Sequence, residues 1–167
     1  MKKFSILLFT LAICFFSVAQ TDSLPAAPYK RFPNVPPFKL LLTDSSTHYT
    51  KEDLPKKKAV MLMLFSPECD HCKHETEEII NNIDAFKKVQ IIMSTTLPFD
   101  KMLTFYNSYD LKCFDNIIVG KDAGYMLPVF YEIRQLPFLA FYNKRKELIS
   151  VSPSQMPVNK IIEELKK

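Results

Sequence analysis

The fold is indicated most directly by residues 59–75, "AVMLMLFSPECDHCKHE". The first eight of these residues form an apolar run broken only by the last of them, a serine, which is typical of a β-strand buried on both faces of a sheet. Two cysteines, Cys69 and Cys72, follow with two residues between them. From Cys72 to Phe86, apolar side chains recur at helical spacing. We therefore predict a buried strand that passes into a helix, with the cysteine pair at the junction.

Strand and helix patterns alternate along the rest of the chain. The predicted strands cover residues 38–44, 59–66, 89–95, 137–143 and 147–152, with a strand or its approach at 114–120. Helices are predicted after the cysteines, over 98–109 with Asp100 as cap, and over 156–167. Residues 124–133 are ambiguous because Pro128 interrupts them. This order predicts an α/β fold with a central mixed β-sheet flanked by helices on both faces.

The first twenty residues, 1–20, predict a secretory signal peptide. Lys2 and Lys3 give a positive start, residues 4–16 are almost wholly apolar, and small residues follow at 17–19. The apolar run is too short for a membrane span, and an uncleaved N-terminal anchor is the alternative interpretation. Because no second run of 18 apolar residues follows, we expect the processed chain to be soluble and without a membrane tether.

A Pro-rich lead-in, with five prolines over residues 21–37, precedes one predicted domain over residues 38–167. Removal of the two leader lysines lowers the formal net charge from +4 to +2, which favours neither nucleic acid nor a membrane surface as a partner. The chain has only two glycines, Gly120 and Gly124, and they exclude a glycine-rich phosphate-binding loop.

Three cysteines remain once the signal peptide is removed: Cys69, Cys72 and Cys113. The start of a helix favours an anion, so the Cys69 thiolate is stabilised there and is the candidate nucleophile. Cys72 lies nearly one turn further on, where it can resolve a mixed disulfide on Cys69. The odd count leaves Cys113 over. We expect it to be a packed core thiol, with a role as a third exchange partner as the alternative.

Charged neighbours act on this pair in opposite directions. A protonated His71 favours the thiolate, whereas Glu68 and Asp70 oppose it by like-charge repulsion, so the reduction potential stays open. A structural disulfide and a metal site are alternative interpretations of the pair. The candidate ligands for Cu(I) or Zn are Cys69, Cys72, His71 and His74. His48, the remaining histidine, is expected in a loop and solvated.

At these residues the chain resembles the thioredoxin superfamily, and within it the exported thiol–disulfide oxidoreductases of the TlpA/ResA type. The stretches "PNVPPFKLLLTD", "KKAVMLMLFSPECDHCKHE" and "RQLPFLAFYN" carry the resemblance. It implies a thioredoxin-like fold in which Cys69 is the nucleophile, Cys72 the resolving thiol and Pro137 a cis-proline beside them. It also implies an insertion before the cis-proline strand, over the long stretch between Ile91 and Pro137.

Two departures from the family pattern bear on activity. Glu68 stands where the family usually has tryptophan. Met63 stands where thioredoxin keeps a buried acid, so the sequence leaves the proton acceptor for Cys72 unidentified.

The resemblance and the cysteine pair predict an enzyme that exchanges disulfides with protein partners in the periplasm or cell envelope. An upstream redox protein would supply or accept electrons, and no cofactor is needed. One alternative is a copper-binding module on the same fold. Another is a peroxiredoxin-like peroxidase, which Ser66 favours and Leu62, standing where that family has proline, disfavours.

Overall fold

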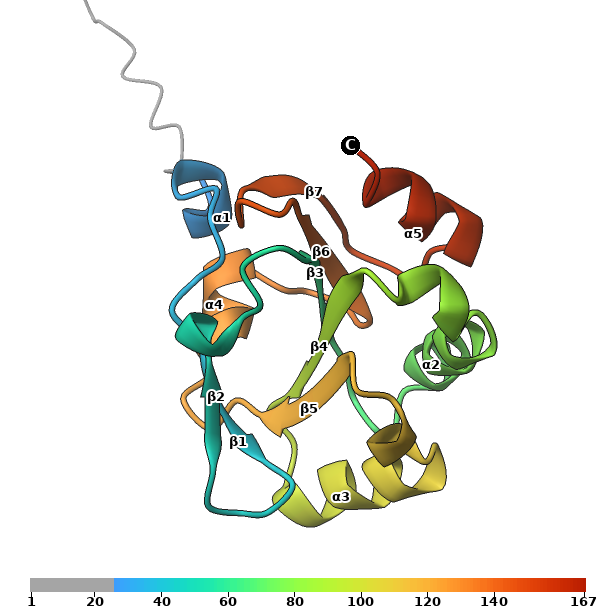
Figure 1. Ribbon diagram of the computed structural model, residues 1–167. Coiled ribbons are helices and arrows are strands. Elements are labelled where there is room, and N and C mark those ends of the chain that lie inside the picture. The colour runs from blue at the N-terminus through green and yellow to red at the C-terminus, as the bar shows by residue number, and fades with distance from the viewer. Residues whose placement is uncertain (1–25) are drawn as a thin grey trace, which may run out of the picture.

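A single seven-stranded sheet organises the computed structural model, which describes residues 26–167; the predicted signal peptide lies outside the described residues. The strand order is β2-β1-β5-β4-β3-β6-β7 (Figure 1). The strands are β1 (Lys39–Leu42), β2 (His48–Thr50), β3 (Ala59–Leu64), β4 (Val89–Thr95), β5 (Ile117–Lys121), β6 (Phe138–Tyr142) and β7 (Leu148–Ser152). The pairs β3–β4 and β4–β5 are parallel and the other pairs are antiparallel. The mixed sheet is as predicted.

Helices cover both faces of this sheet, which confirms the predicted α/β class (Figure 1). The helices are α1 (Pro28–Arg31), α2 (Asp70–Asn81), α3 (Phe99–Ser108), α4 (Met126–Tyr131) and α5 (Val158–Glu164). Three short 3-10 helices are η1 (Lys51–Asp53), η2 (Ile83–Phe86) and η3 (Leu111–Cys113). Side chains of α2, α3 and α5 pack on one face of the sheet, and those of α4 pack on the other.

The central strand β3 explains the apolar run that begins at Ala59. All six of its residues are buried. Met61 and Met63 pack into the core under α2, whereas Leu62 and Leu64 pack into the core under α4. Because successive side chains of a strand point to opposite faces, a strand covered on both sides must be apolar at every position.

Several local predictions need correction. Asp100 is not the cap of α3: Pro98 holds that position and Asp100 lies in the first turn. The ambiguous stretch contains α4, with Pro128 in its first turn, where the missing N–H costs no helical hydrogen bond. His48 lies in the short strand β2 and not in a loop, although it is exposed as expected.

Part of the Pro-rich lead-in packs on the domain. The Val35 amide donates to the Lys146 carbonyl at 3.1 Å, and the Leu148 amide donates to the Pro33 carbonyl at 2.8 Å. Val35 itself is buried. This segment therefore runs along the turn between β6 and β7.

Candidate active site

Cys69 is the N-cap residue of α2, five residues after the buried strand β3 ends at Leu64. Its carbonyl accepts the amides of Cys72 and Lys73, both at 3.0 Å, so the helix begins at this residue. The side chain is half-buried, and its Sγ lies 3.7 Å from the Leu136 carbonyl oxygen as a hydrogen-bond donor. The Leu136–Pro137 peptide bond is cis. The segment before β6 thus lies against the candidate nucleophile.

Cys72 lies behind Cys69 and is fully buried. Burial raises the pKa of its thiol well above the usual value, and the hydrogen bond with the Cys69 side chain raises it further, while the Ser66 backbone amide opposes both. Both cysteines are free thiols in this structure. A buried thiol with a raised pKa needs a nearby base before it can attack a disulfide.

Glu75 supplies a carboxylate at the required place. It lies three residues after Cys72 on the same face of α2 and is only 2% exposed. Burial raises its pKa to about 7, against which a hydrogen bond from the Met156 amide at 2.8 Å and the nearby His74 act weakly. Its other oxygen, Oε1, has no hydrogen-bond partner among the described residues. A carboxyl that titrates near neutral pH beside a buried thiol is suited to take its proton.

A small cavity borders Glu75. It measures about 220 Å³ and is also lined by His74, Glu78 and Gln155. His74 and Gln155 are exposed, so the cavity offers a proton on Glu75 a route to solvent. The predicted site residue His71 contacts this lining as well, since its Nδ1 lies 2.9 Å from Oε1 of Gln155.

The acidic neighbours of Cys69 are paired with lysines. Asp70 accepts an ion pair from Lys73 at 2.8 Å, and Glu68 pairs with Lys101 of α3. The sequence suggested that both carboxylates oppose the Cys69 thiolate as isolated negative charges. In the structure each carboxylate is paired with a lysine, so neither acts in that way. Because all four side chains are exposed, solvent screens these pairs and each contributes little stability.

A cleft opens beside Cys69 on the α4 side. It measures about 420 Å³, and its walls include Tyr125, Ile133 and Leu136. The Ser94 hydroxyl also lines it; this group is buried and has no hydrogen-bond partner among the described residues. Tyr125 is 57% exposed although it is a large aromatic residue. An open cleft with apolar walls beside a half-buried thiol is a docking place for a substrate chain.

The structure bears on two further predictions, the burial of Cys113 and a metal site formed by cysteines and histidines. Cys113 is exposed in η3, and the prediction of a packed core thiol is wrong, because Leu111 and Phe114 take the inward positions around it. Within residues 26–167, no group of three or more His, Cys, Asp or Glu side chains gathers as a metal site would require.

Comparisons with solved structures identify the architecture. A secreted disulfide oxidoreductase of Mycobacterium tuberculosis, homologous to E. coli DsbE, superposes with a TM-score of 0.63 at 18% identity, over 76% of this chain and 92% of that one. StoA from Bacillus subtilis gives 0.60 at 16% identity, over 76% and 94%. The chain has a thioredoxin-like fold. Peroxidoxin BcpB from Mycobacterium tuberculosis shares this fold, with a TM-score of 0.67 at 16% identity over 80% and 94%.

At these identities the likeness establishes the thioredoxin-like fold and leaves the activity to the site itself. No protein-family model matches the chain, and a search of curated proteins finds no match. Among the described residues, none of the helices has the length and apolarity that a membrane crossing needs.

Proposed function

We propose that this chain is an exported thiol–disulfide oxidoreductase that exchanges disulfides with protein partners through the motif Cys69-Asp70-His71-Cys72. The observation that carries the proposal is the arrangement along α2. A half-buried thiol caps the helix, a buried thiol lies behind it, and the buried carboxyl of Glu75 follows on the same face. This order matches attack, resolution and proton acceptance.

The reaction begins when the Cys69 thiolate attacks one sulfur of a partner disulfide. A bond forms between Cys69 Sγ and that sulfur, the partner disulfide breaks, and the second partner sulfur leaves as a thiolate. Glu75 then takes the proton of Cys72, whose sulfur attacks Cys69 Sγ. The mixed disulfide breaks and the partner leaves fully reduced, while the cysteine pair is oxidised by two electrons. The reverse sequence oxidises a dithiol partner.

The cleft beside Cys69 supports a protein as the partner. Leu136, which precedes Pro137, borders the thiol, and an extended chain of a partner would lie along this segment with a side chain in the cleft. Regeneration of the pair needs a second redox protein upstream, since the proposed reaction uses no cofactor. Export to the periplasm or cell envelope accords with the leader sequence and with the persistence of disulfides there.

The test is a redox titration of the processed chain against glutathione buffers, with Cys69→Ser and Cys113→Ser compared. We expect a reversible two-electron transition in the native chain and in Cys113→Ser, and none in Cys69→Ser. Cys72→Ser should accumulate a mixed disulfide on Cys69 with a partner disulfide. Absence of a reversible transition, or tight Cu(I) retention that blocks both thiols, would overturn the proposal in favour of a metal-binding role.

A further inference from the structure

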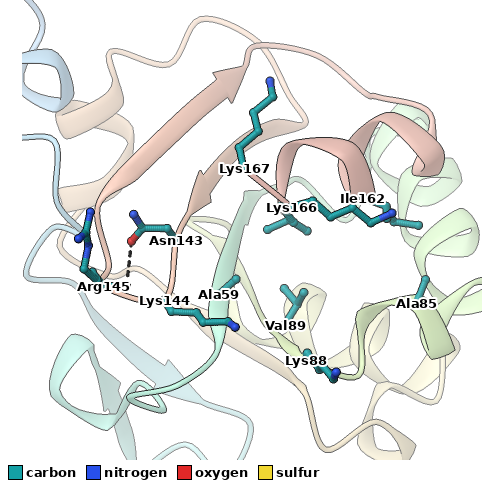
Figure 2. Close-up of a pocket in the computed structure, with 11 residues that line it drawn as sticks. Ala59, Ala85, Lys88, Val89, Asn143, Lys144, Arg145, Ile162, Lys166 and Lys167 are labelled. Atoms are coloured by element: carbon teal, nitrogen blue, oxygen red, sulfur yellow. Dashed lines mark hydrogen bonds between the residues drawn. The ribbon is translucent and has the colours of Figure 1, made fainter.

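A third cavity opens at the end of the sheet opposite to Cys69. It measures about 550 Å³ and lies between the β6–β7 turn, the first residues of β3 and β4, and the C-terminal end of α5 (Figure 2). Its lining residues are Ala59, Ala85, Lys88, Val89, Asn143, Lys144, Arg145, Ile162, Leu165, Lys166 and Lys167. Since β3 alone spans six residues, this cavity lies roughly 20 Å from the cysteine pair. It plays no part in the proposed disulfide exchange.

The rim of the cavity is cationic. Five of its lining residues are lysine or arginine and none is acidic. Arg145 pairs with Glu147, and Lys167 pairs with Glu164. The other three cations are Lys88, Lys144 and Lys166; they are exposed and have no carboxylate partner among the described residues. Figure 2 shows these three lysines arranged around the mouth. Three unpaired cations at one opening favour an anionic ligand.

The floor of the cavity is apolar. Ala59 and Val89 are buried at the starts of their strands, and Ile162 and Leu165 of the α5 segment are only partly covered. An inorganic anion would contact only the lysines of the rim, and the apolar floor would stay exposed to water. No aromatic side chain lines the cavity, so it lacks the platform on which single-stranded nucleic acid stacks its bases. The apolar floor therefore favours a ligand that carries an apolar group attached to its anionic group.

The turn that forms one wall is held rigidly. Lys146 adopts a left-handed conformation with φ of 69°, which L side chains rarely take. Its Nζ donates to the carbonyl oxygens of Pro55 and Lys58, both at 2.7 Å, and so ties the turn to the loop before β3. Lys144 and Arg145 belong to this turn, so it also fixes the positions of their backbones. The cavity is thus formed before any ligand arrives, which lowers the entropy cost of binding.

We propose that this cavity binds an anionic amphiphile, a molecule with an alkyl chain and a phosphate or carboxylate head group. The alkyl chain lies on the floor of Ala59, Val89 and Ile162, and the head group contacts the three unpaired lysines. The volume is in the range of small-molecule sites. This binding is independent of the cysteine chemistry at the other end of the sheet.

The test uses the chain that begins at Thr21, which keeps every buried core residue because these lie between Val35 and Ile161. Dodecyl phosphate, below the concentration at which it forms micelles, is titrated by calorimetry, and amide NMR shifts locate the site. Inorganic phosphate and dodecyl maltoside supply the head group alone and a neutral amphiphile. Each should bind at least about tenfold more weakly than dodecyl phosphate. Shifts are expected at Ala59, Ala85 and Val89.

Two variants test the rim and the floor. Lys144→Gln with Lys166→Gln should weaken binding about tenfold, since each cation near a head group accounts for about threefold or more. The matched control, Lys39→Gln with Lys51→Gln, removes two exposed lysines at the other edge of the sheet and should bind as the native chain does. Ala85→Glu places a carboxylate at an exposed position of the lining and should weaken binding at least as much as the rim variant does.

The proposal is overturned if dodecyl phosphate binds no better than inorganic phosphate or dodecyl maltoside. It is also overturned if the rim variant, folded by circular dichroism, stays within twofold of the control, or if the shifts fall at the Cys69 cleft. Vesicles of phosphatidylglycerol and of phosphatidylcholine then separate two sources of the ligand. Capture by the anionic vesicles alone supports a membrane lipid, and binding of the monomer without vesicle capture supports a free amphiphile.

Discussion

Replacement of Glu75 by glutamine should move stability and activity in opposite directions. The pKa of this carboxyl is about 7 in the folded chain, raised from 4.5 chiefly by burial. Between these two values the folded chain holds a proton that the unfolded chain has released, so folding stability falls as pH rises through this window. The difference corresponds to about 3 kcal/mol once the carboxyl is fully ionised above pH 7. Most of that loss, about 2 to 3 kcal/mol, falls between pH 5 and pH 8.

Glu75→Gln removes this ionisation and keeps an oxygen for the Met156 amide. Guanidinium unfolding at a series of pH values should show a variant that is more stable than the native chain at pH 8, by up to about 3 kcal/mol. The difference should shrink towards pH 5. The control is Glu77→Gln on the same helix, whose carboxylate is exposed and should leave the pH dependence of the native chain unchanged.

The same variant should be impaired in catalysis. Loss of a positioned base slows a proton-transfer step by about a hundredfold or more, so resolution of a mixed disulfide on Cys69 should slow to that extent at pH 7. Rapid mixing followed by acid quench measures this step directly. Glu75 is not a buried proton acceptor for Cys72 if Glu75→Gln lowers stability at pH 8, or if it resolves the mixed disulfide as fast as Glu77→Gln does.

Two further predictions concern stability and are checked by the same unfolding assay. Gly120→Ala should lower the free energy of unfolding by about 1 to 3 kcal/mol, because a Cβ there would lie 2.7 Å from the Leu40 Cβ on the neighbouring strand. At Gly124 the nearest atom to such a Cβ is 3.9 Å away, so Gly124→Ala should change the free energy of unfolding by no more than about 0.5 kcal/mol. Equal effects at the two glycines would contradict this packing. Tyr142→Phe leaves the buried hydroxyl of Tyr131 without its partner and should cost about 1 to 3 kcal/mol, and replacing both tyrosines by phenylalanine should restore most of that loss.

The strands of the sheet interior were predictable because they are buried on both faces. The β4 segment was predicted with the bounds that the structure shows, 89–95, since all seven residues are buried and the immediate neighbours, Lys88 and Thr96, are polar. The edge strand β2 was missed: three partly exposed residues, His48 to Thr50, carry no apolar run and depend on pairing with β1. Pattern reasoning succeeds where burial dictates residue type and fails where a neighbouring strand provides the order.

The candidate site also has residues that the sequence predicted and one that it did not. Cys69 and Cys72 were recognisable because their spacing is itself a chemical signal. Glu75 was missed, although it follows Cys72 at the i+3 position on the face that also carries Ile79, because a search for apolar spacing passes over an acid. An acidic residue on an otherwise apolar helix face is a usable signal, since a carboxylate is buried only at a cost that a function must justify.

The cationic cavity could not be predicted from the sequence, for a different reason. Lys88, Lys144 and Lys166 lie 56 and 22 residues apart in the sequence, and the small formal net charge of the chain, +4, hides their proximity. Lys88 and Lys144 meet because β3 and β4 run parallel, so both strands begin at one end of the sheet, and the β6–β7 turn returns to that end. Lys166, just after α5, lines the same cavity. The same parallel pairing places the chain after β3, with Cys69, at the opposite end. One feature of topology therefore separates the thiol chemistry from the cationic cavity, and substitutions at either end should leave the other intact.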